Sequence, residues 1–331
     1  METTELRPLS LGELLDRTFT LYREHFGIFV GIMAIPAALF VPVNYFISQA
    51  YVKSFTDPTR LASAPPAAVM GIFWRFMGVM AVVALVSMIL YSIVAAAVTF
   101  AVSEAYLGRK STVATAYRNA LGKVWRLLAV ALNVLIRVLG ISIAVSFVLG
   151  GAGAILIVGL TAAIPGAAAA QPAAVAVMAL LIIAVYAAVI GVMVYLALRY
   201  AVAIPALMLE DLGVLASIRR SVQLTKGRRG QVFVALLLAA VISAVGSIVF
   251  YVPFYIATMI SIARAHSIPP WLSLTGTISS AIGHSLTGPI FLIVLVLCYY
   301  DTRIRKEAFD LQFMMASLDR SAPTTGTVPS A

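Results

Sequence analysis

The stretch VAVMALLIIAVYAAVIGVMVYLAL, from Val175 to Leu198, contains no charged residue and decides the class of the fold. About 20 mostly apolar residues suffice to cross a bilayer as an α-helix. The whole chain has the same character: 62% of its 331 residues are hydrophobic, 11% are charged and the mean hydropathy is +1.03. Soluble globular domains carry about 45–50% apolar and about 25% charged residues. The sequence therefore predicts an all-α integral membrane protein.

Further apolar runs lie on both sides of this stretch. Together they predict six transmembrane helices, at Phe29–Ala50, Phe76–Val102, Leu127–Leu149, Val175–Leu198, Val232–Thr258 and Thr277–Tyr299. The first 26 residues mix acidic and basic side chains and show no cleavage pattern, so they are not interpreted as a signal peptide.

Residues 150–172 connect the third and fourth predicted spans and are rich in alanine and glycine. Two interpretations stay open, because this segment either extends the third span or forms a short helix on the membrane surface. Its glycines at 150, 151 and 153 lie in apolar surroundings and favour close helix packing over phosphate binding.

The placement of lysine and arginine predicts the orientation of the spans. Most of the 23 basic residues fall before the first span, in the second and fourth connections and after the sixth span, which share one side of the membrane. Because cationic loops stay cytoplasmic, both termini are expected in the cytoplasm. The net charge of +10 favours anionic membrane lipids as partners, and no basic module with interleaved aromatic residues suggests nucleic acid.

A short amphipathic segment precedes each pair of spans. Ser10–Phe26 places leucine and aromatic residues on one helical face and charged residues opposite, and Ser10 with Glu13 forms a capping box. Ser111–Arg126 and Asp211–Arg229 repeat this design. We therefore predict a threefold repeat of interfacial helix, span and span within one membrane domain. The repeats are expected at residues 1–109, 110–208 and 209–300.

The last segment, residues 301–331, follows the sixth predicted span. A fourth interfacial helix is expected at Asp301–Met315, where apolar and charged residues again take opposite faces. The tail Ser321–Ala331 is rich in proline, threonine, serine and glycine, and we expect it to be disordered.

Three segments carry a resemblance to a known family: RPLSLGELLDRTFTLYREHF at Arg7–Phe26, SIRRSVQLTKGRR at Ser217–Arg229 and YYDTRIRKEAFDLQ at Tyr299–Gln312. The chain is similar, over nearly its whole length, to the bacterial glycerophosphoryl diester phosphodiesterase membrane domain family of multi-pass proteins. The resemblance implies a bacterial cytoplasmic membrane and no established activity for the membrane part. A TIM-barrel hydrolase needs roughly 250 residues, so no phosphodiesterase domain is expected here.

Residues that could carry catalysis are scarce. Cys298 is the only cysteine and the three histidines are widely separated, so neither a disulfide nor a metal site is expected. The H-E-x-x-H and Walker A motifs are absent. In Gly283-His284-Ser285, the histidine and serine are adjacent on one helix and point in different directions. We therefore expect a protein that is not an enzyme and that uses no cofactor or metal.

Arg137 is the clearest charged residue inside a predicted span. It lies about 15 Å deep at 1.5 Å per residue, where a cation costs about 2.5–3.5 kcal/mol. Asn133 lies one turn earlier on the same face, and His284 has a similar depth in the sixth span, so the three side chains could meet. Three interpretations stay open for Arg137: it positions helices by binding backbone carbonyls, it binds an anionic head group or substrate, or it lies nearer an interface.

Acidic residues mark the ends of the even-numbered spans. They are expected to pair with nearby cations, Glu104 with Arg109, Glu210 and Asp211 with Arg219 or Arg220, and Asp301 with Arg303 or Arg305. These groups form either a ring of structural ion pairs or a site for a head group or partner. The basic residues expected at the membrane surface are Arg219, Arg220, Lys226, Arg228, Arg229, Arg303, Arg305 and Lys306.

Two functions agree with this pattern. The first is a non-catalytic membrane protein that organises or assists the cell envelope through lipid or protein contacts of its basic interfacial helices. The alternative is a transporter or lipid-translocating protein with Arg137 lining an intramembrane path, because internal repeats are common in transporters. The concentration of charge near one membrane surface favours the first.

Overall fold

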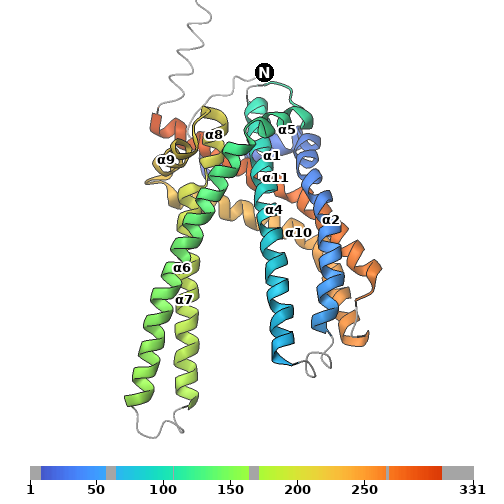
Figure 1. The fold of residues 1–331 in the computed structure, drawn as a ribbon. Coiled ribbons are helices and arrows are strands. Elements are labelled where there is room, and N and C mark those ends of the chain that lie inside the picture. The colour runs from blue at the N-terminus through green and yellow to red at the C-terminus, as the bar shows by residue number, and fades with distance from the viewer. Residues whose placement is uncertain (1–8, 57–64, 107, 164–170, 266–267, 308–331) are drawn as a thin grey trace, which may run out of the picture.

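The computed structural model describes residues 9–56, 65–106, 108–163, 171–265 and 268–307, and every regular element among them is a helix. Figure 1 shows long helices that extend from a group of short helices, here called the short-helix end. The long helices are α2 (Phe26–Thr56), α4 (Pro66–Tyr106), α6 (Val124–Ala163), α7 (Gln171–Tyr200), α10 (Arg229–Ala265) and α11 (Pro270–Glu307). The short helices are α1 (Leu11–Glu24), α5 (Val113–Gly122), α8 (Ala203–Glu210) and α9 (Val214–Thr225). The all-α prediction is confirmed.

All six long helices are long and apolar enough to cross a membrane, and each predicted span lies inside one of them. At 1.5 Å per residue, the 31 residues of α2 measure about 46 Å and the 41 residues of α4 about 61 Å. These lengths exceed the bilayer core of about 30 Å. α6 continues to Ala163, so the described part of residues 150–163 extends the third span. Residues 164–170 lie outside the described residues.

Three short helices, α1, α5 and α9, lie where the sequence predicts amphipathic segments. The capping box of α1 is confirmed, because the Ser10 hydroxyl accepts from the Glu13 N–H at 3.3 Å and the Ser10 N–H donates to the Glu13 carboxylate at 2.7 Å. α8 is not among the predicted elements; it ends at Glu210, and the residue that caps it, Asp211, has a left-handed φ of 48°. The threefold sequence repeat stays a prediction.

No separate interfacial helix begins at Asp301 within the described residues. α11 runs without a break from Pro270 to Glu307, because residues 290–307 contain neither glycine nor proline to interrupt it. The prediction of a separate fourth helix is therefore wrong where it can be compared. Residues 308–315 and the tail Ser321–Ala331 lie outside the described residues.

α11 lies at the centre of the described helices and packs against α10, α2, α4 and α1. Glycines allow this packing, since small residues let membrane helices approach closely. A Cβ atom on Gly283 would lie 2.9 Å from the Cβ atom of Phe250, and one on Gly246 would lie 2.7 Å from Thr287 Cγ2. A Cβ atom on Gly288 would collide with Met33 of α2. The close contacts of α11 with α10 and α2 therefore require glycine at these positions.

α6 and α7 form a hairpin that extends away from the other long helices (Figure 1). Most of its large apolar side chains are exposed, such as Phe147 and Leu180. Among the described residues, no atom outside their own helix backbone and chain neighbours lies within 4 Å of the Cβ positions of Gly150, Gly151 and Gly153. The prediction that these glycines serve close packing is therefore wrong; close contacts are made by glycines on α10 and α11 and by Gly31 of α2, whose Cβ position lies 2.8 Å from Val113 Cγ2.

Pro36 lies inside α2 without ending the helix. Because proline has no N–H, the carbonyl of Ile32, four residues earlier, loses its helical donor. The Tyr117 hydroxyl of α5 donates to this oxygen at 2.6 Å. Burial raises the pKa of Tyr117 to about 12, so the hydroxyl stays protonated at neutral pH and ties α5 to the span.

Candidate functional site

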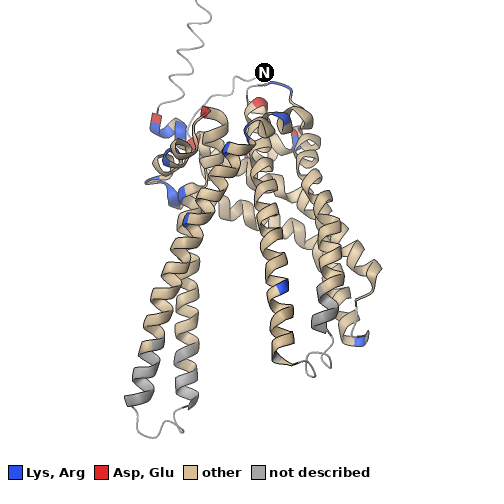
Figure 2. Ribbon diagram, in the orientation of Figure 1, with Lys and Arg blue, Asp and Glu red and all other residues tan. Residues whose placement is uncertain are grey.

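Ionisable side chains gather at the short-helix end of the molecule. Figure 2 shows blue and red segments among the short helices and at the adjoining ends of the long helices, while most of the length of the long helices is tan. Such a distribution is expected where helices leave the apolar part of a membrane. The charged groups at this end therefore form the first candidate site.

Arg220 of α9 connects the ends of three helices. Its Nε atom donates to Glu210 of α8 at 2.8 Å, and its terminal nitrogen Nη2 donates to Glu307 of α11 at 2.7 Å. The hydrogen bond to Glu307, followed by that to Glu210, raises the pKa of Arg220 above its ordinary value. All three side chains are half-buried, so this charged group holds α8, α9 and α11 together.

Tyr299 and Arg303 of α11 extend this network. The Tyr299 hydroxyl donates to the Glu210 carboxylate at 2.6 Å, and Arg303 donates to the Tyr299 oxygen at 3.2 Å. Arg303 also donates to Glu307 at 3.3 Å. Of the two partners predicted for Asp301, Arg303 is thus occupied elsewhere.

Asp301 ties Leu9, at the start of the described chain, to α11. Its Oδ1 atom accepts from the Leu9 N–H at 2.9 Å and from Arg305 Nε at 2.8 Å. Arg305 in turn donates to the Leu9 carbonyl at 2.6 Å. Because buried polar groups need partners, this buried and fully paired carboxylate serves the fold.

Asp211 and Glu104 also have cationic partners. Asp211 accepts from Lys123 at 2.8 Å and Arg126 at 3.1 Å, which connects the end of α8 to the start of α6. The hydrogen bond from Lys123 is the main cause that lowers the pKa of Asp211. The pairing predicted for Asp211 with Arg219 or Arg220 is therefore wrong, whereas Glu104 reaches its predicted partner Arg109 at 3.8 Å.

Five cations near the α9–α10 turn and the end of α11 have no carboxylate partner among the described residues. We call them the basic surface: Arg219, Lys226, Arg228, Arg229 and Lys306. The turn between α9 and α10 contains Gly227, whose φ of 81° favours glycine. Figure 2 shows the blue segments of this region close together. The acids of the neighbouring network are already neutralised, so the basic surface carries uncompensated positive charge.

Neutral groups hold several of these cations in place. Lys306 Nζ donates to the carbonyl of Lys226 at 2.7 Å, and Arg228 donates to the Gln231 side chain at 2.8 Å. Arg229 donates to the Tyr195 hydroxyl at 2.8 Å and lies 4.8 Å above the centre of that ring. These contacts orient the positive charges without cancelling them.

Arg137, Asn133 and His284 do not meet in the structure. Arg137 is exposed on α6, where the described residues give it no hydrogen-bond or ion-pair partner, and Asn133 lies on the same helix with a buried, unpaired Oδ1 atom. His284 lies on α11, where it lines a cavity to which α6 contributes no residue. The expected cluster is absent because equal depths in two spans do not place their helices side by side.

That cavity lies among α2, α4, α10 and α11 and has a volume of about 910 Å³. Ligand pockets commonly measure about 300–1,000 Å³. Its walls are mostly apolar, and none of its lining residues is charged. The cavity could not be predicted from the sequence, because helices that are distant in the chain assemble it; the spacing of polar residues along α11 was the only signal for it.

The described residues give no arrangement suited to covalent or metal chemistry. Among them, no group of histidine, cysteine and acidic side chains is placed to hold a metal ion. The Ser285 hydroxyl donates to the Ala281 carbonyl at 2.7 Å rather than to His284. Cys298 is a buried free thiol. What the arrangement offers is binding, at the basic surface and in the cavity.

Comparison with known proteins gives one family. Searches among curated proteins and among solved structures find no match to the chain, and nothing found links it to the glycerophosphoryl diester phosphodiesterase membrane domain family, so that resemblance stays a prediction. Residues 26–305, which include all six long helices except the last two residues of α11, match a family of unknown function, DUF7544. The chain belongs to this family.

Proposed function

We propose that the protein is a non-catalytic integral membrane protein that binds anionic lipid at its basic surface, on the cytoplasmic side of a bacterial inner membrane. It organises or assists the envelope through these contacts. The observation that carries the proposal is the set of cations without carboxylate partners beside acids that are already paired. Each Lys or Arg near an anionic membrane surface contributes about 1 kcal/mol.

The position of Arg229 supports this proposal further. It lies at the start of α10, and the Tyr195 ring beneath it belongs to the last turns of α7. Tyrosine is enriched where membrane helices reach the head groups, because its ring is apolar and its hydroxyl is polar. The basic surface would therefore lie at the depth of lipid phosphates.

Lipid retention tests the proposal. We would purify the full chain in mild detergent, mix it with phosphatidylglycerol and phosphatidylcholine of matched chains, and count bound lipids by native mass spectrometry. The wild type should retain phosphatidylglycerol in preference. The triple variant Arg219→Gln/Lys226→Gln/Arg228→Gln should lose most of this preference, since three contributions of about 1 kcal/mol disappear.

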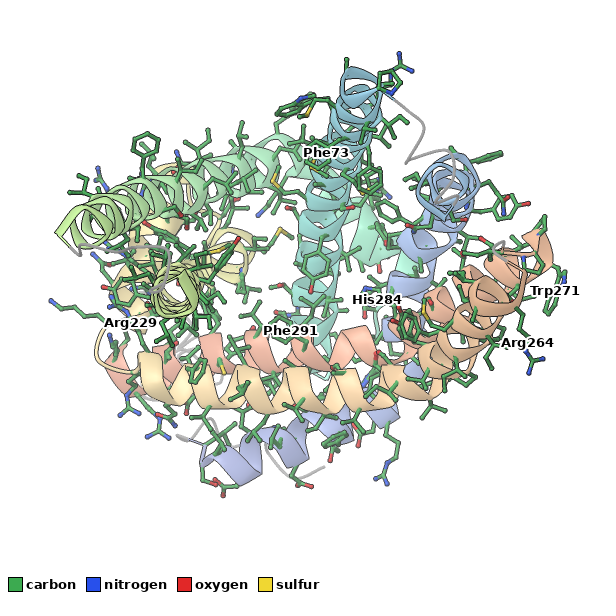
Figure 3. The ribbon with its side chains drawn as sticks, turned by 90° about the horizontal axis from the view of Figure 1, so that it is seen from below. Phe73, Arg229, Arg264, Trp271, His284 and Phe291 are labelled. Carbon is green, nitrogen blue, oxygen red and sulfur yellow. The ribbon has the colours of Figure 1, made fainter. Side chains whose placement is uncertain are left out.

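Arg264→Gln is the matched control. Figure 3 shows Arg229 and Arg264 at opposite ends of α10, so this variant removes an exposed cation far from the basic surface. It should keep the preference for phosphatidylglycerol. If the triple variant retained both lipids as the wild type does, lipid binding at this surface would be excluded and a protein partner would become the next hypothesis.

Cysteine labelling tests the orientation. Because Cys298 is buried, a membrane-impermeant maleimide should give little background. Trp271→Cys, at the far end of the molecule, should be labelled in intact cells with a permeabilised outer envelope, whereas Lys226→Cys should be labelled only after the inner membrane is opened. The reverse result would contradict a cytoplasmic basic surface.

A further inference from the structure

The cavity among α2, α4, α10 and α11 is a second candidate binding site, and it shares no residue with the basic surface. Its α11 wall runs from Leu272 to His284. His284 is 14 residues from Pro270, the end of α11 remote from the basic surface, or about 21 Å along the helix. The cavity therefore follows α11 over about three turns, beginning close to the end of the helix that is remote from the basic surface.

A stripe of uncharged polar side chains follows the α11 wall. Ser273, Thr277, Ser280 and His284 all line the cavity, and their spacing of four, three and four residues places them on one helical face. The hydroxyls of Thr277 and Ser280 donate to helix carbonyls at 2.7 and 2.9 Å. Their oxygens keep free lone pairs, so this part of the stripe can accept hydrogen bonds from a ligand.

Side chains with hydrogen-bond donors line the same space. Tyr91, Tyr251 and Tyr255 line the cavity, and no hydroxyl partner for them is found in the described part of the chain. The imidazole of His284 likewise has no hydrogen-bond partner there, although neutral imidazole provides one donor and one acceptor. Figure 3 shows His284 where α11 passes α2. Because unpaired polar groups in an apolar medium are costly, a polar ligand would stabilise this site.

The absence of charge narrows the ligand class. Among the described lining residues there is no aspartate, glutamate, lysine or arginine, so a phosphate or ammonium group inside the cavity would find no permanent counter-ion. The remaining walls, such as Met33, Phe40 and Leu90, suit hydrocarbon. We propose that this cavity binds an uncharged lipid whose head group carries hydroxyls, with the head group on the α11 stripe and the chain against the apolar walls.

Photo-crosslinking tests the proposal on the full chain in phosphatidylcholine nanodiscs. One probe is diacylglycerol with a diazirine in one acyl chain, and the matched probe is phosphatidylglycerol with the same chains. Labelled residues are located by peptide mass spectrometry. The diacylglycerol probe should label the α2 and α11 walls of the cavity in preference, and unlabelled diacylglycerol should compete while unlabelled phosphatidylglycerol should not.

Two variants sharpen the test. Ala281→Trp fills the cavity from α11 and should abolish the labelling. His284→Leu removes hydrogen bonds to the head group and should lower it about fivefold, as the loss of one such bond predicts. Ala187→Trp, which places the same bulk on the exposed surface of α7, is the control and should leave the labelling unchanged.

The competition on wild-type protein decides the outcome even if a variant fails to fold. Equal labelling by both probes without competition would show that bulk acyl chains fill the cavity, and would overturn the proposal. Preferential labelling by the phosphatidylglycerol probe, or no labelling of the cavity walls, would overturn it as well.

Discussion

The α6–α7 hairpin and the α10–α11 pair are both apolar, yet they have opposite environments. Over the apolar 18-residue window of each helix, the mean hydropathy is 2.3 for α6 and 2.1 for α11. Inside the molecule, however, 11% of this window is buried in α6 and 67% in α11. In water the more hydrophobic segment would be the buried one. In a membrane the lipid is as apolar as leucine, so hydropathy does not separate the core from the surface.

Small and polar side chains distinguish the α10–α11 pair from the exposed α6–α7 hairpin. α11 and its partner α10 use Gly246, Gly276 and Gly283 for close contacts and join by hydrogen bonds such as Ser279 to the Phe250 carbonyl at 2.8 Å. The α6 glycines whose surroundings are described, at 140, 150, 151 and 153, have open space, and Ser146 of α6 bonds only to a carbonyl of its own helix. Contacts between helices, rather than apolar composition, therefore mark the centre of this protein.

The difference in packing between the two helix pairs is tested most strongly by adding a side chain to a glycine in each. Gly283→Leu forces a collision with Phe250 and should destabilise the protein by about 1–3 kcal/mol, the usual cost of overpacking. Gly150→Leu, where the Cβ position is free, should leave stability unchanged. Thermal unfolding in detergent measures both. Equal losses would mean that α6 has a packing partner in solution.

Removing one hydroxyl from each region should have a smaller effect. The Ser247 hydroxyl of α10 bonds across to the Thr287 hydroxyl of α11 at 2.8 Å, so Ser247→Ala should cost about 0.6–1.7 kcal/mol. Ser146→Ala in α6 loses only a bond within its own helix and should change stability little. The same thermal unfolding assay compares them, and a larger loss for Ser146→Ala would contradict the contrast.

The smallest expected effect concerns Asp211, whose ion pairs with Lys123 and Arg126 attach the start of the α6–α7 hairpin to α8. Lys123 holds the pKa of Asp211 below its ordinary value of 3.8. A lowered carboxylate pKa stabilises the folded state above the unfolded pKa, and this contribution disappears as the pH falls through the folded pKa. The protection of amides at the start of α6, which is the intrinsic exchange rate divided by the observed rate at the same pH, should therefore fall below about pH 4. The change should be small, because Asp211 is exposed.

Asp211→Asn is the matched variant for this pH dependence. It should show lower protection than the wild type at neutral pH and no further loss of protection in acid. Unchanged pH dependence in the variant would assign the effect to another group.

The six spans could be predicted from the sequence, because the thickness of a bilayer requires long apolar runs. The start of α1 could be predicted as well, because Ser10 and Glu13 form a local capping signal. Several ion pairs were also within reach, since Glu104 and Arg109, or Asp301 and Arg305, are close in the chain. The faces of the long helices could not be predicted. A helix that is apolar all round carries no periodic signal for its inner side. The sequence therefore predicts a cluster of Arg137 with His284 that the structure does not contain, and it does not predict the cavity that His284 lines.

The central position of α11 has a consequence for biosynthesis. Of the six spans, α11 is the last to leave the ribosome, yet it supplies the principal contacts of α10 and α2 and the carboxylate that receives Leu9. The earlier spans therefore wait in the membrane without their main partner until synthesis has passed residue 300. A ribosome that stops before this point would leave a chain with inserted helices but no core, and such a product should be a preferred substrate for membrane proteases.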